Sequence, residues 1–384
     1  MRRFTALVAL ALVVSGAPLL AAYGCSGSSV APDLVAPADA ATPSQDDGSV
    51  VPGEDGSAGP DSATADASAT HDSGTSRPLG TVAEIAPGSA CPRGTLCRGI
   101  RVTCPGAEDI DGVVAVADPA GVALKGTIVT HIGGGGTGFL FQQPVIARYQ
   151  AAGFRIAAIS WAKPWEEITS GTRSIKAAAC RPATAFRWVF DVVHAKSRTL
   201  GFCAQGQSGG AGAVSYALAT YGLEGILDHA VLTQGPPFGR MDCGCGSTKD
   251  GCASVPALCP EIASPVLPLP GPTIDTWAGT TTCGTPGVTD ADLTRLRDDS
   301  SAWNDGDFDY PKTHLSGWFC AQRPNGTTGG GAFFLGRVTP KPKVFCSPSC
   351  AVESIYDAAN TLTGGKNVVD AMTDEMIAEC VPRH

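Results

Sequence analysis

The sequence predicts an α/β protein with a mostly parallel central sheet and helices on both of its faces. Short β-branched runs alternate with helical stretches of about ten to fifteen residues, the pattern of repeated βαβ units. The chain has 384 residues, of which 43% are hydrophobic, so it can bury a large core. The strands are expected at 112–117, 126–130, 155–160, 200–205, 229–233, 314–319 and 343–346, and the helices at 144–152, 183–196, 209–221 and 365–380.

The first 25 residues are typical of a secretory signal. Arg2 and Arg3 precede an apolar run over residues 4–20, which is too short for a transmembrane anchor. The small Gly24 directly before Cys25 resembles the lipobox of bacterial lipoproteins, in which the cysteine is lipidated and becomes the mature N-terminus. The alternative is ordinary cleavage near this point. We therefore expect an exported protein, held by a lipid on Cys25 at the periplasmic side of a bacterial membrane or at the cell surface.

Residues 26–80 are expected to form a disordered acidic tether. This stretch carries nine acidic side chains and one basic one, and it is otherwise mostly Ser, Gly, Ala, Pro and Thr. Such a composition buries too little apolar surface to offset the entropy of ordering the chain. The folded domain is then expected over residues 81–384. The net charge of −9 excludes the basic surface that a nucleic-acid-binding protein needs.

The cysteine content predicts disulfides and an oxidising compartment. The chain has fifteen cysteines, and removing Cys25 leaves fourteen, enough for seven pairs. Residues 238–312 break the strand–helix alternation and are expected to form a disulfide-stapled insertion or lid. Zinc bound by Cys243, Cys245, Cys252 and Cys259 is an alternative, but their spacing is loose for a zinc motif and the compartment favours disulfides. We expect no metal and no cofactor. The cysteines of this insertion are Cys243, Cys245, Cys252, Cys259 and Cys283.

Two glycine-rich turns carry the chemical signal. Residues 206–210 form a G-x-S-x-G pattern between an expected strand and an expected helix, which would present the Ser208 hydroxyl at the sheet edge. Residues 133–136 are four consecutive glycines at the end of the strand 126–130. Their backbone N–H groups could stabilise an oxyanion together with that of Gly209. The expected oxyanion hole comprises Gly133, Gly134, Gly135 and Gly209.

With these two motifs in this order, most of 98–384 resembles the α/β-hydrolase family of esterases and lipases. The resemblance implies that Ser208 is a nucleophile and that His131 braces the glycine loop. In the family the acid usually follows the seventh strand and the catalytic histidine follows the eighth. Here Glu353 stands near the position expected for the base, and Asp242 is an alternative acid.

The remaining histidines are poorly placed to serve as the base. His229 and His314 begin expected strands, at the sheet edge opposite Ser208. His384 follows a final helix that leads away from the catalytic edge. A serine needs a base to take its proton, so the sequence leaves the active site incomplete.

Two functions therefore compete. The first is a lipid-anchored serine esterase that forms an acyl-serine on Ser208 with a small-molecule or lipid ester. The second is a hydrolase-like binding lipoprotein that lacks the triad histidine and catalyses nothing. In both, the protein is expected to be a monomer that contacts the membrane only through its lipid and binds no nucleic acid.

Overall fold

The computed structural model describes residues 76–169, 173–260, 262, 268–278, 281–283, 287–322, 324–351 and 355–384. The expected signal segment with Cys25, residues 26–75 of the tether, and Glu353 lie outside these residues. None of the helices within the described ranges combines the length and the apolar character that crossing a membrane requires.

A nine-stranded sheet forms the centre of the fold, in the order β1-β2-β3-β5-β4-β6-β7-β8-β9. The first three strands and the β3–β5 pair are antiparallel. The six strands from β5 across to β9 run parallel, so the predicted mostly parallel sheet is confirmed. The strands are β1 Thr81–Ile85, β2 Leu96–Cys104, β3 Ala107–Ala117, β4 Gly126–His131, β5 Phe154–Trp161, β6 Gly201–Gln207, β7 His229–Thr233, β8 His314–Cys320 and β9 Lys343–Ser347.

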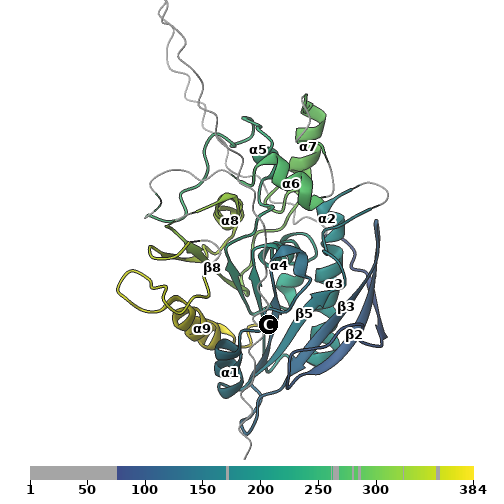
Figure 1. Ribbon diagram of the computed structural model, residues 1–384, viewed down its shortest axis with the longest axis vertical. Helices are drawn as coiled ribbons and strands as arrows, with labels where there is room; N and C mark the ends of the chain where they lie inside the picture. The colour runs from purple at the N-terminus through teal and green to yellow at the C-terminus, as the bar shows by residue number, and fades with distance from the viewer. Residues whose placement is uncertain are drawn as a thin grey trace, which may run out of the picture. The chain divides into compact units, whose positions relative to one another are not determined.

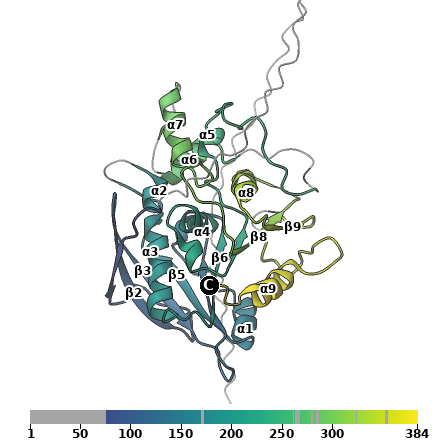
Figure 2. The same ribbon diagram turned by 180° about the vertical axis from the view of Figure 1, so that it is seen from behind.

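Helices cover both faces of the sheet (Figures 1 and 2). Side chains on β6 alternate between the two faces: Cys203 packs in the core under α1 and α9, and Ala204 packs in the core under α3 and α4. The α-helices are α1 Gln143–Ala151, α2 Ile175–Ala178, α3 Cys180–Trp188, α4 Gly209–Ala219, α5 Met241–Gly244, α6 Gly271–Ala278, α7 Asp290–Asp298, α8 Gly326–Arg337 and α9 Val368–Glu379. This layered arrangement, with its sheet order and strand directions, is an α/β-hydrolase-like fold.

Disulfides pair all fourteen cysteines beyond Cys25, as the cysteine count predicts. Cys203–Cys380 joins β6 to the end of α9, and Cys259–Cys346 joins the Cys-rich insertion to β9. The zinc alternative is wrong, because the four cysteines that it requires are all oxidised. The remaining bonds are Cys91–Cys97, Cys104–Cys180, Cys243–Cys252, Cys245–Cys283 and Cys320–Cys350.

Candidate active site

Ser208 occupies a sharp turn between β6 and α4. Its backbone lies in the left-handed region, with φ 50° and ψ −114°, a conformation that is strained for a side chain with a Cβ. The flanking glycines are needed for space, since a Cβ on Gly206 would lie 2.4 Å from the carbonyl oxygen of Gly210. Ser208 caps α4 without a side-chain hydrogen bond, and the residue is half-buried. The hydroxyl is therefore not used for capping the helix.

The glycine loop after β4 lies directly against this serine. A Cβ on Gly133 would come within 2.9 Å of the Ser208 Cβ, so only glycine allows this approach. Gly134 and Gly135 follow with φ of 59° and 76°, values that favour glycine. Gly209 is the first residue of α4, where a backbone N–H has no acceptor within the helix. The structure thus places Gly133 against Ser208 and Gly209 directly after it, while Gly134 and Gly135 follow Gly133 in the loop.

His131 braces the glycine loop, as the sequence analysis expects. The indole Nε1 of Trp161 donates to His131 Nε2 at 2.8 Å, so Nδ1 carries the proton and donates to the Ile132 carbonyl at 2.9 Å. The ring is fully buried, and desolvation lowers the pKa of His131 to about 4. Both nitrogens are occupied and the ring is neutral at physiological pH. His131 therefore holds the loop and cannot accept the Ser208 proton.

The other described histidines hydrogen-bond away from Ser208. They lie at or near the amino ends of the parallel strands. His229 is the first residue of β7, and His314 is the first residue of β8. No hydrogen bond links any histidine in the described ranges to Ser208. The partners are Thr127 Oγ1 and the Ser197 carbonyl for His194, the His314 carbonyl and Glu375 for His229, Glu379 for His314, and the Leu227 carbonyl for His384.

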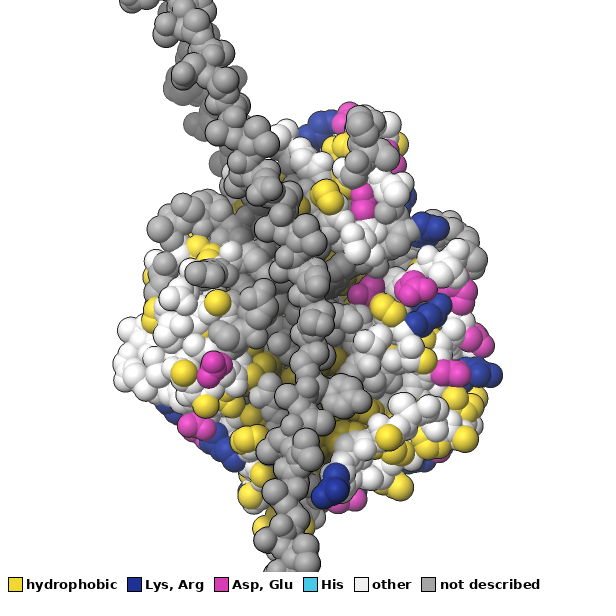
Figure 3. All heavy atoms as spheres, viewed as in Figure 1, with side chains coloured by type: hydrophobic (Ala, Val, Ile, Leu, Met, Phe, Trp, Pro, Cys, Tyr) yellow, Lys and Arg dark blue, Asp and Glu magenta, His cyan; other side chains and the backbone are white. Residues whose placement is uncertain are grey.

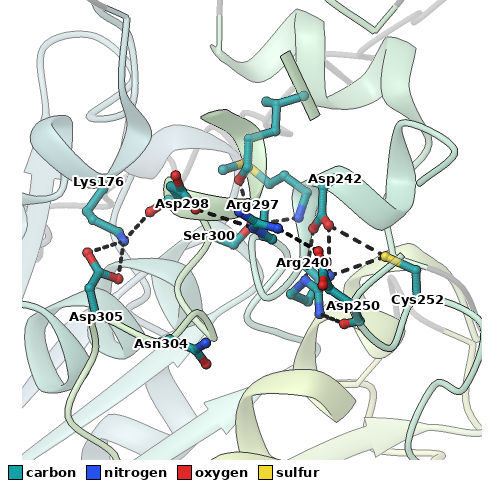
Figure 4. A network of polar contacts seen from close by, with 12 residues as sticks. Lys176, Arg240, Asp242, Asp250, Cys252, Arg297, Asp298, Ser300, Asn304 and Asp305 are labelled. Atoms are coloured by element: carbon teal, nitrogen blue, oxygen red, sulfur yellow. Dashed lines mark hydrogen bonds and ion pairs between the residues drawn. The ribbon is translucent and has the colours of Figure 1, made fainter. Parts of the chain in front are cut away.

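Asp242 lies in a buried ion pair rather than beside a base. Both of its carboxylate oxygens accept from Arg240, at 2.9 and 2.7 Å, and its exposure is 1%. Figure 4 shows that Arg240 also donates to the backbone of Asp250, at 2.7 Å. This geometry gives Asp242 the role of anchoring the insertion around α5. It does not orient a histidine.

A buried polar network lies beneath the turn that carries Ser208. Tyr149 donates to Gln205 Oε1 at 2.8 Å, and Gln205 Nε2 donates to the Tyr356 hydroxyl at 3.1 Å. Tyr356 also contacts Thr233 Oγ1 at 3.1 Å, and burial raises the pKa of Tyr356 to about 12. The segment after β9 therefore reaches the ends of β6 and β7. Sequence reasoning missed this network, although a buried Gln next to the elbow is a signal for it.

Sequence reasoning also missed a buried carboxyl group close to the glycine loop. Glu166 follows β5 and is 4% exposed. It lines a cavity of about 530 Å³ together with Gly134 of the loop and Thr276 of α6. Desolvation raises the pKa of Glu166 to about 7. A carboxyl group with such a pKa can exist in either charge state near neutral pH, which is a property of functional sites more often than of exposed surfaces.

Figure 3 shows acidic and basic side chains interspersed along the margin of one face rather than gathered by sign. Many of the charged groups in the described ranges are paired, as Arg101 is with Asp111 and Arg148 with Asp370.

No protein-family model matches the chain, and no curated protein matches it. Solved structures with a similar chain course include the hyperthermophilic esterase of the archaeon Pyrobaculum calidifontis, at 14% identity and a TM-score of 0.48, covering 79% of this chain and 87% of that one. A bacterial heroin esterase has 13% identity and a TM-score of 0.48, covering 75% and 84%. A thermophilic carboxylesterase from a metagenomic library has 11% identity and a TM-score of 0.43, covering 75% and 90%. At this level of similarity, these proteins carry no argument about the reaction of this chain.

Proposed function

We propose that this chain is an exported serine hydrolase, anchored through a lipid on Cys25, that cleaves carboxylic esters through an acyl-Ser208 intermediate. One observation carries the proposal: Ser208 keeps a strained left-handed backbone with its hydroxyl unused for capping, and Gly133 lies against it. Strain of this kind persists only where the surrounding structure holds it in place, and it clusters at active sites.

The chemistry follows from these positions. Ser208 Oγ attacks the ester carbonyl carbon while a base takes its proton, and the carbonyl oxygen becomes an oxyanion. The N–H of Gly209 and those of the Gly133–Gly135 loop would donate to this oxygen. The C–O bond then breaks, and the leaving alcohol takes the proton from the base. Water, activated by the same base, hydrolyses the acyl-serine to the carboxylic acid and frees Ser208.

For the base we propose Glu353. The described histidines are bonded elsewhere, and Tyr356, three residues after Glu353, contacts Gln205 and Thr233 beside the elbow. The chain that follows β9 is therefore anchored at Tyr356, at the carboxyl edge of the sheet where Ser208 lies. A carboxylate is an effective base when its surroundings raise its pKa towards neutrality.

A binding lipoprotein without catalytic activity is the second candidate. It is favoured by a specific observation: each of the five histidines in the described ranges is committed to a structural hydrogen bond. In this candidate the fold and the elbow are retained, and the cavity next to the glycine loop binds a ligand that is not cleaved.

A fluorophosphonate probe separates the two candidates, because it labels only an activated serine. The purified chain without its signal should be labelled and should hydrolyse p-nitrophenyl esters, and Ser208→Ala should lose both activities. Ser254→Ala is the matched control, since Ser254 is an exposed serine of the insertion. Absence of labelling in folded wild-type protein would contradict the esterase and favour the binding lipoprotein.

Export and anchoring need a separate test. In a bacterial host that lipidates exported proteins, the wild type should label with a radioactive fatty acid and should partition into the membrane fraction. Cys25→Ser should be exported without label and appear in the soluble fraction. A labelled Cys25→Ser variant would contradict the assignment of Cys25.

A further inference from the structure

The turn that carries Ser208 is held at two points by one residue, Thr233. The backbone N–H of Ser208 donates to the Thr233 carbonyl at 2.8 Å. The Thr233 hydroxyl donates to the carbonyl of Gly206 at 3.1 Å. Thr233 is the last residue of β7 and is fully buried, and it stands opposite Gln207 in the register of the sheet. The strained turn is therefore bonded to Thr233 both before Ser208 and at Ser208 itself.

The number of hydroxyl protons fixes the direction of the hydrogen bonds that lead to Thr233. A hydroxyl has one proton, and that of Thr233 is used on Gly206. Thr233 Oγ1 must therefore accept in its 3.1 Å contact with the Tyr356 hydroxyl. Because Tyr356 gives its proton to Thr233, its oxygen accepts from Gln205 Nε2 at 3.1 Å, which fixes the orientation of the amide. Gln205 Oε1 then accepts from Tyr149 at 2.8 Å.

These bonds form one directed chain of donors, from Tyr149 of α1 to the carbonyl of Gly206. Tyr149, Gln205 and Thr233 are at most 2% exposed. Burial raises the pKa of the Tyr356 hydroxyl to about 12, so it keeps its proton and donates at neutral and mildly alkaline pH. Hydrogen bonds between buried groups are costly to break, since the group left behind has no water to bond. The chain is therefore a stiff support beneath the turn.

We propose that Thr233 is a positioning residue for Ser208 and that Tyr356 acts through Thr233. The inference rests on the proposed function, because it concerns how the serine is held for attack on an ester. A strained turn keeps its conformation only where its surroundings hold it. Attack on a carbonyl carbon tolerates little misplacement, so a turn that relaxes should slow the chemical step more than it weakens substrate binding.

The test compares Thr233→Val with the matched control Thr313→Val. The Thr313 hydroxyl is also buried and also donates to backbone carbonyls, those of Glu224 and Leu227, but at the amino edge of the sheet. Both substitutions keep the shape of the side chain and remove one hydroxyl.

Thr233→Val should lower kcat for p-nitrophenyl butyrate about tenfold, as the loss of one buried hydrogen bond allows, with KM within about twofold. The rate of fluorophosphonate labelling should fall by the same factor. Thr313→Val should leave kcat and labelling within about twofold of the wild type. Thr233→Ser keeps the hydroxyl, and it should restore both rates.

A double-mutant cycle tests the route from Tyr356. Tyr356→Phe keeps the ring and removes the donor, and it should lower kcat about threefold, because Thr233 still donates to Gly206 without it. In the Thr233→Val chain, the same change should have no further effect, since Tyr356 acts through Thr233. Two losses that multiply would contradict this route.

Hydrogen exchange of the turn gives a measurement that needs no catalysis. The Ser208 N–H is bonded to the Thr233 carbonyl, so a loosened turn should exchange about fivefold faster in Thr233→Val than in the wild type. Thr313→Val should exchange like the wild type. Mass spectrometry of the peptide that spans residues 204–210 reads the difference. If Thr233→Val does not fold, Tyr356→Phe decides, and unchanged exchange in that variant overturns the proposal.

The proposal is also overturned if Thr233→Val and Thr313→Val have equal kcat, labelling and exchange, or if Thr233→Ser does not restore the rates. Failure of the esterase proposal has a different result. In that case the folded wild type is not labelled, while exchange at the turn is still faster in Thr233→Val, and Thr233 holds the turn of a protein that cleaves no ester.

Discussion

The two edges of the parallel sheet use polar residues in opposite ways. At the amino edge, histidines are paired with carboxylates of α9: His229 Nε2 lies 3.1 Å from Glu375, and His314 Nδ1 lies 2.9 Å from Glu379. At the carboxyl edge, Ser208 and the glycine loop meet, and none of the histidines in the described part of the chain hydrogen-bonds to Ser208. The histidine–carboxylate pairs that a hydrolase would need are present, but at the edge away from the serine.

This contrast shows that residue type alone does not identify a catalytic group. The pairs at the amino edge hold α9 on the sheet, with Lys343 adding a hydrogen bond of 2.6 Å to Glu379. These contacts, with Lys343 first, lower the pKa of Glu379 to about 2. The carboxyl edge instead shows backbone strain and close approach, which are the marks of a site.

The largest expected effect separates the two edges directly. Glu353→Gln should lower kcat for ester hydrolysis by about four orders of magnitude, the typical cost of removing a catalytic base. His229→Gln should leave kcat within about twofold, because His229 lies at the opposite edge and makes structural contacts. Steady-state kinetics with p-nitrophenyl butyrate measure both. A large loss of kcat in His229→Gln, with kcat unchanged in Glu353→Gln, would place the catalytic base at the amino edge instead.

The second prediction concerns Asp242 as a structural group. Asp242→Asn leaves Arg240 buried without its charge partner, which should lower the free energy of unfolding by about 3–5 kcal/mol. Asp290→Asn, which breaks an exposed pair with Lys249, should cost less than about 1 kcal/mol. Urea unfolding measures both. If Asp242→Asn instead keeps its stability and loses kcat, Asp242 is the catalytic acid.

The third prediction tests the close approach at the carboxyl edge. Gly133→Ala would place a Cβ 2.9 Å from that of Ser208, so the loop must move and its donors with it. We expect kcat to fall about 10²–10³-fold, comparable to the loss of an oxyanion donor. Gly138→Ala is the control, since its Cβ would meet nothing within 4 Å. If Gly133→Ala is as active as Gly138→Ala, the glycine loop does not contribute to catalysis.

The smallest expected effect is on stability and arises from His131. Its pKa is about 4 in the folded chain, against an ordinary value of 6.5. Because the folded state disfavours the protonated ring, stability is full above pH 6.5 and is lost as pH falls towards 4. Between pH 7.5 and pH 5, His131 should account for a loss of about 2 kcal/mol. Urea unfolding at several pH values gives the slope of the unfolding free energy against pH for the wild type and for His131→Gln. Equal slopes would contradict a buried neutral ring.

The parallel strands and the elbow could be predicted because their signals are local. The strand at 229–233 is confirmed at both ends, and the turn at Ser208 follows from the G-x-S-x-G pattern between an expected strand and an expected helix. Helix α8 could not be predicted in this way, since it contains five glycines among twelve residues. Those glycines let α8 pack closely: a Cβ on Gly330 would lie 2.4 Å from the Pro236 carbonyl oxygen. Tertiary contact overrides helix propensity there.

The network and the cavity near the site depend on distant parts of the chain. Tyr356 meets Gln205 across 151 positions, and no local pattern contains such a pair. Glu166 is an ordinary residue of a strand–helix connection until Gly134 and α6 enclose it. The strands β1 and β2 were not predicted either. They pair antiparallel at the edge of the sheet, outside the parallel βαβ pattern.

The Cys259–Cys346 bond has a consequence for proteolysis of the folded chain. A protease that cuts once after Lys249 or after Arg297 would divide the chain into two fragments. Each of these positions lies inside a disulfide loop, so a disulfide connects the two fragments. The fragments would stay covalently joined and would migrate as one band on a non-reducing gel. The insertion can thus be nicked without being shed.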